Sequence, residues 1–418
     1  MRQIRSVLVI LLGIMFALSG ASQAKVKLIY TNNVSDVTAN VEQQLIDLFM
    51  AENPEIEVEY HNAPITPEQL LLWTAGGMCP DVFMVHSHTV SELVGQGLLA
   101  PLDEHVCKDG EVDVEDLFPE GVEEFSHEGV LYGIPYEYHM VAALFYNVNA
   151  VAESGLAPPP SEWPWEDFLK YAAKLTRMDG NEITRWPFYT YHPLNFMHSW
   201  GGALVDDWRN PTDTLIDSAE AIAGYEAYVS LNTLGLMAPS GYYTQLFLSG
   251  TVAMVVSGLW GSYSFADANF EWDITLPPLG EGPSGGRGYE FVSRALGMSA
   301  QTKHAEEAFK LLKFLAYDER ALKTRALSIA SQGVQGEMPA RISVARGEAF
   351  VANDLGPKNK MLMLMVADDV YRMPRHPEAR RIWNLGNQVG VRGIQGESIR
   401  NVAISVAEQV RAILRQDR

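Results

Sequence analysis

The chain has 418 residues, of which 47% are hydrophobic and 20% are charged, and its formal net charge at pH 7 is −21. A single hydrophobic core stops growing near about 250–300 residues, so this length favours two lobes, and the composition argues against a disordered chain. The acidic balance argues against nucleic acid as a partner, because phosphate binding needs clustered lysine and arginine.

The first 24 residues have the organisation of a secretory signal peptide. Arg2 and Arg5 precede an apolar run over residues 7–18, and the small residues of 21–24 follow it. The apolar run is too short to span a membrane, and small residues at these positions favour cleavage. We therefore expect cleavage after Ala24 and export to a bacterial periplasm, without a lipid anchor because no cysteine lies near that point.

The chain that follows opens in the order strand, helix, strand, helix, strand. Residues 25–30 and 56–60 alternate between apolar and polar side chains, and residues 80–85 form a third strand-like run. Residues 41–50 and 66–75 carry apolar side chains at helical spacing. This order is typical of a parallel sheet with helices on its faces.

Polar side chains follow two of these strands. Asn33 comes just after the first strand, and His86 and His88 come just after the third. Ligands of α/β proteins bind outside the carboxyl ends of strands, so these positions predict side chains that face a cleft. A metal site at the two histidines lacks a suitable third ligand nearby.

The two cysteines, Cys79 and Cys107, leave one question open. An exported protein meets an oxidising compartment, which permits a disulfide between them. Geometry decides whether the disulfide forms, and the sequence does not supply it. Neither cysteine has the spacing of a metal site or the context of a catalytic thiol.

The middle and the end of the chain continue the alternation. Residues 165–175 and 219–234 have helical periodicity, and residues 272–276 form a strand-like run. Residues 303–314 are strongly periodic and predict a helix, as do residues 397–414 at the end of the chain. We expect helices, and no strand, over residues 348–418.

Residues 247–265 combine a helix end, a short strand at 253–256, and a glycine turn into another helix. Trp260 lies just after the turn at Gly258, where the strand gives way to the helix. An indole there offers a large flat apolar surface that suits the face of a sugar ring, although the same side chain would also suit a core.

This stretch has the spacing F-x-x-G-x-x-A-M-x-x-x-G-x-W. It resembles the signature of extracellular solute-binding proteins of ABC importers, the family typified by maltose-binding protein. Similar matches follow one another along nearly the whole mature chain, and their order carries the resemblance. They lie at residues 80–83, 97–102, 129–147, 160–176, 200–202, 303–314 and 336–341.

The resemblance implies an α/β, two-lobed periplasmic-binding-protein clamp of type II. Each lobe is expected to hold a mainly parallel sheet flanked by helices, with the cleft between the lobes. The chain would cross between lobes near 136–138, 291–294 and 336–341. The N-terminal lobe then comprises 25–136 plus 293–338, and the C-terminal lobe 137–292 plus 339–418, with the last helix on the second lobe.

The resemblance also implies a function. The protein would be a monomeric binding protein that captures a carbohydrate by lobe closure and delivers it to the membrane permease of an ABC importer. We expect no catalysis, no cofactor and no metal. Aromatic rings would cover the sugar faces and polar groups would bind its hydroxyls. The candidates for stacking are Trp260, Tyr136 and Trp200, and Gly201 is a candidate in the turn that follows Trp200. The candidates for hydrogen bonding are Asn33, His86, Glu137 and Arg294, with Arg341 as a weaker candidate.

Two alternatives stay open. The same fold could bind a non-sugar solute, such as a polyamine, a phosphorylated polyol or a ferric ion held by Tyr242 and Tyr243. A secreted glycan-active hydrolase would instead need two carboxylates about 5–10 Å apart, for which Asp206 and Asp207 are examples. The chain shows no nucleophile elbow, zinc spacing or phosphate loop that would favour another enzyme.

Overall fold

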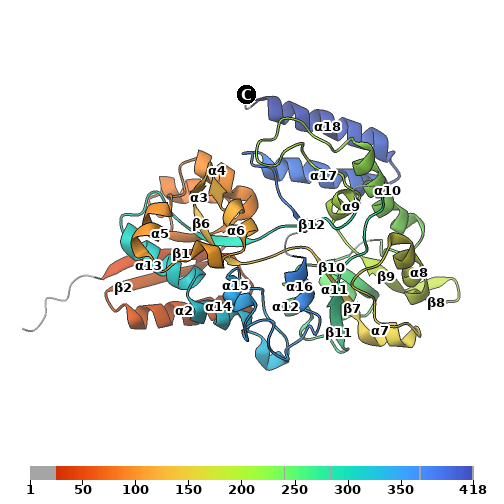
Figure 1. Ribbon diagram of the computed structural model, residues 1–418, viewed down its shortest axis with the longest axis horizontal. Helices are drawn as coiled ribbons and strands as arrows, with labels where there is room; N and C mark the ends of the chain where they lie inside the picture. The colour runs from red at the N-terminus through yellow and green to blue at the C-terminus, as the bar shows by residue number, and fades with distance from the viewer. Residues whose placement is uncertain (1–24, 240, 283–284, 367–368, 417–418) are drawn as a thin grey trace, which may run out of the picture.

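The computed structural model describes residues 25–239, 241–282, 285–366 and 369–416, so the expected signal peptide lies outside the described residues. Two five-stranded sheets lie side by side, each covered by helices, and extended segments connect them (Figure 1). Among the described residues, no helix combines the length and the apolar content that a bilayer crossing requires.

The first sheet has the strand order β2-β1-β3-β13-β6. Its strands are β1 (Val26–Asn32), β2 (Ile56–Asn62), β3 (Val82–His86), β6 (Gly133–Glu137) and β13 (Arg294–Met298). The helices of this lobe are α2 (Asp36–Glu52), α3 (Pro67–Ala75), α4 (Val90–Gly95), α5 (Asp103–Asp109), α6 (Pro119–Glu124), α13 (Ala305–Ala316) and α14 (Glu319–Ala326). Short elements complete it: η1 (Ser87–Thr89), η2 (Val114–Asp116), η3 (Ala330–Gln332), β4 (Ser126–His127) and β5 (Val130–Leu131).

The second sheet has the order β11-β7-β10-β9-β8. Its strands are β7 (Ala143–Asn147), β8 (Arg177–Asp179), β9 (Glu182–Tyr189), β10 (Val252–Ser257) and β11 (Trp272–Thr275). Its helices are α7 (Val148–Glu153), α8 (Trp165–Leu175), α9 (Pro193–Ser199), α10 (Ala219–Thr233), α11 (Tyr243–Leu248), α12 (Gly261–Phe265), α16 (Met361–Met365), α17 (Ala379–Ile394) and α18 (Ile399–Gln416). Between the sheets lie β12 (Tyr289–Glu290), β14 (Val370–Tyr371) and α15 (Ile342–Ala345).

Capping residues mark the N-termini of helices in the first lobe. Ser35 caps α2 by accepting a hydrogen bond from the Thr38 amide, and Thr66 caps α3 ahead of Pro67 at the first helical position. A hydroxyl cap satisfies an amide that the helix itself leaves without a partner, and proline has no amide to satisfy. These caps fix where the two helices begin.

Both sheets are mixed, which corrects the expectation of mainly parallel sheets. Strands β1, β2 and β3 are parallel, but β13 runs antiparallel to β3 and β6, and β7 runs antiparallel to β10 and β11. The reason is the path of the chain. Strands β7 and β13 each enter their sheet directly after a crossing from the other lobe, so they run away from the crossing while their neighbours run toward it.

The C-terminal segment differs from the sequence-based expectation in two places. A short parallel pair forms between β12 and β14, although the sequence predicts no strand beyond residue 348. The sequence also assigns residues after 338 to the second lobe, whereas Val344 and Ala349 pack into the core of the first lobe with Leu45 and Phe309. Apolar contact therefore holds part of this segment on the first lobe.

The last two helices lie on the second lobe, as expected (Figure 1). Apolar residues on one face of α18, including Val402, Val406 and Val410, pack with Ile382 and Val389 of α17. Apolar positions three or four residues apart, such as Ile382, Leu385 and Val389 on α17, make a continuous apolar stripe on each helix. This packing brings the start of α17 to the space between the lobes.

Candidate functional site

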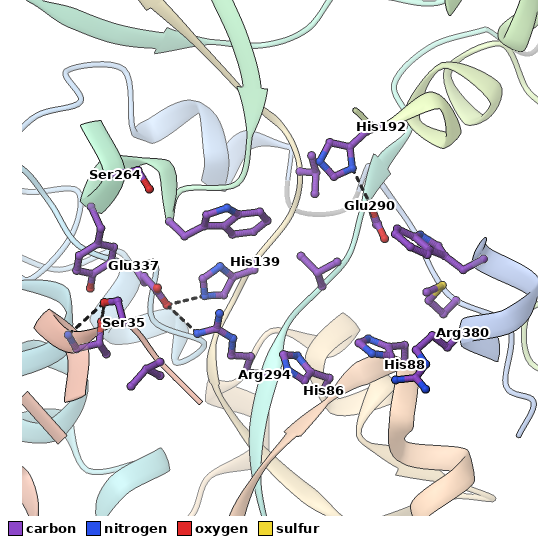
Figure 2. Close-up of a pocket in the computed structure, with 18 of the residues that line it drawn as sticks. Ser35, His86, His88, His139, His192, Ser264, Glu290, Arg294, Glu337 and Arg380 are labelled. Atoms are coloured by element: carbon purple, nitrogen blue, oxygen red, sulfur yellow. Dashed lines mark hydrogen bonds and ion pairs between the residues drawn. The ribbon is translucent and has the colours of Figure 1, made fainter. Parts of the chain in front are cut away.

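A cavity of about 540 Å³ lies where the two lobes meet (Figure 2). It is lined from both lobes and from the connecting segments, in the size range of small-molecule sites. Its lining includes Val34, Ser35, Thr38, His86, His88 and Arg294 from the first lobe, Trp260, Tyr263, Ser264, His192, Arg380 and Trp383 from the second, and His139, Val141, Glu290, Val292 and Glu337 from the connections.

The register of the first sheet gathers one wall of the cavity. Strand β3 ends at His86, and β13 begins at Arg294, which pairs with His86 on one side and with Glu137 of β6 on the other. Because β13 is antiparallel to both neighbours, its first residue lies beside their last residues. Three polar side chains far apart in sequence therefore share one edge of the sheet.

The strand-to-helix turns of the second sheet supply the opposite wall. Half-buried Trp260 precedes α12, and its ring lies 5.5 Å from the ring of His139. A Cβ atom on Gly258 would lie 1.9 Å from the indole, so only glycine permits this close approach. His192 follows β9, and its Nδ1 lies 3.3 Å from Glu290 Oε2. These turns are the positions at which α/β folds present ligand contacts.

Helix α17 closes one side of the cavity. Half-buried Trp383 and exposed Arg380 line it, and the helix lies against η1 of the first lobe. Arg380 Nη2 lies 3.5 Å from Glu68 Oε1 of α3, an exposed ion pair between the lobes. The second lobe thus contributes two tryptophans to the cavity, Trp260 and Trp383.

Buried Glu137, His139 and Glu337 and partly buried Arg294 form a cluster that we call the hinge quartet. His139 Nε2 lies 3.1 Å from Glu137 Oε2 and 2.7 Å from Glu337 Oε2. Arg294 Nη1 lies 3.2 Å from Glu137 Oε2 and 4.0 Å from Glu337 Oε2. The quartet joins all three segments that cross between the sheets, and Figure 2 shows three of its members together at the centre of the cavity.

Each member of the hinge quartet affects the protonation state of the others. Burial alone would lower the pKa of His139, but the carboxylates of Glu337 and Glu137 outweigh it and raise that pKa to about 9. Burial would raise the pKa of Glu337, but His139 and Arg294 hold it well below its usual range. Burial and the charge of Glu337 raise the pKa of Glu137. An imidazolium and a guanidinium therefore compensate the carboxylates.

We expect the stability of the protein to depend on pH through His139. Its pKa of about 9 in the fold lies above the roughly 6.5 of an unfolded histidine, so its stabilisation is complete below that lower value. This stabilisation is lost as the pH rises through about 9, by an amount on the order of 3 kcal/mol. Urea unfolding of the wild type and of His139→Gln at pH 6 and pH 9.5 measures it. Parallel pH profiles for the two proteins would contradict the assignment.

Glu137, His139 and Glu337 could also be read as metal ligands, since one ligand atom from each lies within 4.8 Å of the others. The chemistry of the group argues against a cation at this point. Arg294 already lies beside both carboxylates, and a protonated His139 has no lone pair to offer. We interpret the group as an ion-pair network.

The structure brings together several of the residues that the sequence singles out. Trp260, His86 and Arg294 line the cavity, and buried Glu137 lies directly behind Arg294. Asn33 is exposed and lies outside the lining, although its neighbours Val34 and Ser35 belong to it. His88, interpreted with His86 as a cleft residue, also lines the cavity.

The structure places the other stacking candidates elsewhere, which corrects the prediction. Tyr136 is 1% exposed in the core of the first lobe, where the guanidinium of Arg325 covers its ring at 4.8 Å. Trp200 packs in the core of the second lobe, with its ring 5.3 Å from that of Trp165. Gly201 forms the expected turn with φ 88°, away from the cavity. Core packing uses these aromatic faces, so they are not available to a ligand.

The weaker candidates also lie outside the cavity lining. Arg341 pairs with Asp116 at 2.7 Å and stacks on Tyr317, so it serves the first lobe. Tyr242 is 65% exposed, and Tyr243 packs against the core of the second lobe. The ferric interpretation therefore has no support in this cavity.

The remaining polar and thiol groups are also accounted for. Asp206 and Asp207 lie in an exposed loop, where Asp206 accepts hydrogen bonds from the amides of Asp207, Thr212 and Asp213. Cys79 and Cys107 are free thiols in this structure. The carboxylate pair therefore stabilises a loop, and the disulfide that the sequence leaves open is not formed.

Sequence reasoning missed several lining residues. His139 directly follows the first predicted crossing at residues 136–138, and His192 lies in a stretch rich in histidine and aromatic residues, so both had a weak signal. Glu337 lies within the third predicted crossing. Arg380 and Trp383 had no signal, because only the packing of α17 places them at the cavity.

Comparison with known proteins decides the family. The sequence profile of the bacterial extracellular solute-binding proteins matches residues 35–320. The chain belongs to this family. The resemblance predicted from the sequence motifs is thereby confirmed, and the members of the family are binding proteins and not enzymes.

Two curated relatives and one solved structure illustrate the similarity. This solute-binding protein is 25% identical over 390 residues to the maltotriose-binding protein of Pyrococcus abyssi, covering 90% of this chain and 78% of the relative. It is 28% identical over 304 residues to the galactooligosaccharide-binding protein of Bacillus subtilis, covering 69% and 66% respectively. The substrate-binding protein Lmo0181 of Listeria monocytogenes, solved with cycloalternan, superposes with a TM-score of 0.79 at 20% identity, over 92% of this chain and 98% of that one. The two-lobed fold is thereby confirmed.

Proposed function

We propose that this protein captures a carbohydrate in the cavity between its lobes and delivers it to the permease of an ABC importer. One observation carries the proposal: two half-buried tryptophans, Trp260 and Trp383, line a cavity of about 540 Å³ together with hydrogen-bonding groups from both lobes. Apolar rings and directional polar groups are what a sugar needs, since its ring has apolar faces and a belt of hydroxyls.

The polar groups of the cavity suit hydroxyl recognition. Ser35, Ser264 and Asn384 can each donate and accept, and Glu290 can accept from a hydroxyl donor. Figure 2 places Ser35 and Ser264 at one end of the cavity and Glu290 toward the other. The two relatives named above, which bind maltotriose and galactooligosaccharides by their names, support the same class of ligand.

Capture would proceed by closure of the two lobes about the connecting segments. The lining residues come from both lobes, so a bound sugar makes more contacts when the lobes are closed and shifts the equilibrium toward that state. The hinge quartet lies at the pivot and couples the three crossing segments to the floor of the cavity. We place the lobe boundaries close to residues 137, 293 and 338, with Val344 and Ala349 contributing to the core of the first lobe and Ala345 to that of the second.

The location and assembly that we propose follow from the sequence and the family. The protein acts as a monomer in the periplasm after cleavage of the signal peptide behind Ala24, without a cofactor. Mass spectrometry of the N-terminus of the exported protein tests the cleavage site. A mature chain that begins well away from Lys25 would contradict it.

A thermal-shift screen of the mature protein tests the function. The panel contains mono- and oligosaccharides, polyols, polyamines, amino acids and ferric ion. A ligand at 100 times its dissociation constant stabilises by about 2.7 kcal/mol, which raises the melting temperature by a few degrees. We expect a saccharide to do so. Stabilisation only by ferric ion or amines, or release of hydrolysis products from the oligosaccharides, would contradict the proposal.

A further inference from the structure

One end of the cavity gathers two imidazoles and one guanidinium. His86 ends β3, His88 follows in η1, and Arg380 lies in the first turn of α17. Figure 2 shows the three side chains close together at the side of the cavity opposite Ser35 and Ser264. The rings of His86 and His88 stack at 5.2 Å with an interplanar angle of 22°. We call these three residues the cationic end, because all three carry positive charge once the two imidazoles are protonated.

The positive charge of Arg380 lacks the close compensation found in the hinge quartet. Arg294 and His139 lie beside the carboxylates of Glu137 and Glu337. Among the described residues, by contrast, the one ion pair of Arg380 is an exposed contact with Glu68 at 3.5 Å, and exposed pairs of this kind contribute little. Within the part of the chain that the structure describes, neither the His86 ring nor the His88 ring has a hydrogen-bond partner.

The surroundings of the two imidazoles oppose their protonation in the free protein. Burial, His88, Arg294 and His139 lower the pKa of His86 well below its usual value, and only Glu137 opposes this. Burial lowers the pKa of His88 to about 4, with Arg380 acting in the same direction and Glu290 opposing it. An anion placed beside the rings would reverse this balance, because an opposite charge favours the protonated form.

We propose that the carbohydrate carries an anionic group, a carboxylate or a phosphate ester, which binds at the cationic end between His86, His88 and Arg380. This inference rests on the proposed function and specifies its substrate class. The planar guanidinium of Arg380 can donate two parallel hydrogen bonds to either group, and each protonated imidazole can donate another. The tryptophans and the serines of the cavity remain available to the sugar ring.

Titration calorimetry with matched probes tests the proposal. The pairs are galactobiose with digalacturonate, and glucose with glucose 6-phosphate, so that the first pair tests a carboxylate and the second a phosphate. We expect the acid of at least one pair to bind ten times or more tighter than its neutral counterpart. Arg380→Gln should remove that advantage, so that the acid and its neutral counterpart bind the variant within about twofold of each other.

A neighbouring arginine provides the matched control. Arg381 lies on the same helix, is 64% exposed and pairs with Glu378 at 3.4 Å, and it does not line the cavity. Arg381→Gln makes the same change in net charge as Arg380→Gln. It should leave the affinity of each acidic probe within twofold of the wild type, so a general effect of charge is separated from a contact.

The pH dependence gives a second, independent readout. The carboxyl group of digalacturonate stays ionised above about pH 5, so a change in its affinity between pH 5.5 and pH 7.5 reports on the protein. Binding that protonates His86 or His88 should be about tenfold tighter at the lower pH. Replacing both histidines with asparagine should flatten this dependence, whereas galactobiose should show none.

The outcomes separate this inference from the proposed function. Neutral sugars that bind as tightly as their acidic counterparts, in wild type and Arg380→Gln alike, would overturn the inference and leave carbohydrate capture intact. Glycerol 3-phosphate serves as an additional probe that carries a phosphate but no sugar ring. If it binds tightly while no sugar binds, the result would support the cationic end and contradict carbohydrate capture. A loss of affinity in Arg381→Gln as large as that in Arg380→Gln would also overturn the inference.

Discussion

Replacing Trp260 with alanine is expected to weaken carbohydrate binding by about 2–4 kcal/mol, or roughly thirtyfold to a thousandfold, as for an aromatic anchor in a closed site. The indole lines the cavity and is half-buried beside His139, so its loss removes a stacking surface. The protein should still fold, because the ring lies at the edge of the second-lobe core. Calorimetry with the best saccharide from the screen measures the affinity, and circular dichroism checks the fold.

Two further variants make this test specific. Gly258→Ala should also weaken binding, because its methyl group would displace the indole that lies against the glycine. Trp186→Ala is the control, since Trp186 is likewise half-buried in the second lobe but does not line the cavity. Unchanged affinity in Trp260→Ala, or an equal loss in Trp186→Ala, would contradict the assignment of Trp260.

Replacing Arg325 with leucine is expected to lower the free energy of unfolding by about 3–5 kcal/mol. Arg325 and Glu42 form a buried pair in the first lobe, with side chains 3% and 0% exposed. Nε lies 2.5 Å from Glu42 Oε1, Nη2 lies 2.9 Å from Oε2, and the Tyr30 hydroxyl donates to the same carboxylate at 2.9 Å. Removing the guanidinium leaves a buried carboxylate without its cation. Urea unfolding measures the loss.

The chain offers a control for this variant on the same helix. Arg320 pairs with Glu52 at 2.5 Å, but the two side chains are 52% and 43% exposed, so Arg320→Gln should cost less than about 1 kcal/mol. The double variant Glu42→Leu/Arg325→Leu should recover much of the loss, because it removes both charges together. A cost for Arg325→Leu as small as that for Arg320→Gln would contradict the role of the buried pair.

The secondary structure was largely predictable because its signals are local. Strand β2, helices α3 and α8, and the turn before Trp260 lie where alternation, capping and glycine placement put them. The direction of the strands was not predictable in the same way. Strands β7 and β13 carry no local mark of being antiparallel, since their direction depends on the side from which the chain enters each sheet.

The candidate site was predictable only in part, for a related reason. Trp260 and His86 follow strands, and a rule about strand ends finds such residues. Tyr136 lies on a strand that also reaches the cavity, but its side chain points into the core and contacts Arg325. Adjacent residues of a strand face opposite sides, so a segment can be located correctly while the residue within it is not.

By itself the sequence determined the family, the α/β class, the two-lobed arrangement and most helices and strands, because short-range patterns and the order of motifs encode them. Only the tertiary structure decided which charged side chains contact one another. The hinge quartet joins residues from three distant segments, and the cationic end joins β3 with α17. Contacts between residues from such distant segments depend on strand register and on helix packing. Both result from many weak contacts along the whole chain, so they cannot be predicted from any short segment of the sequence.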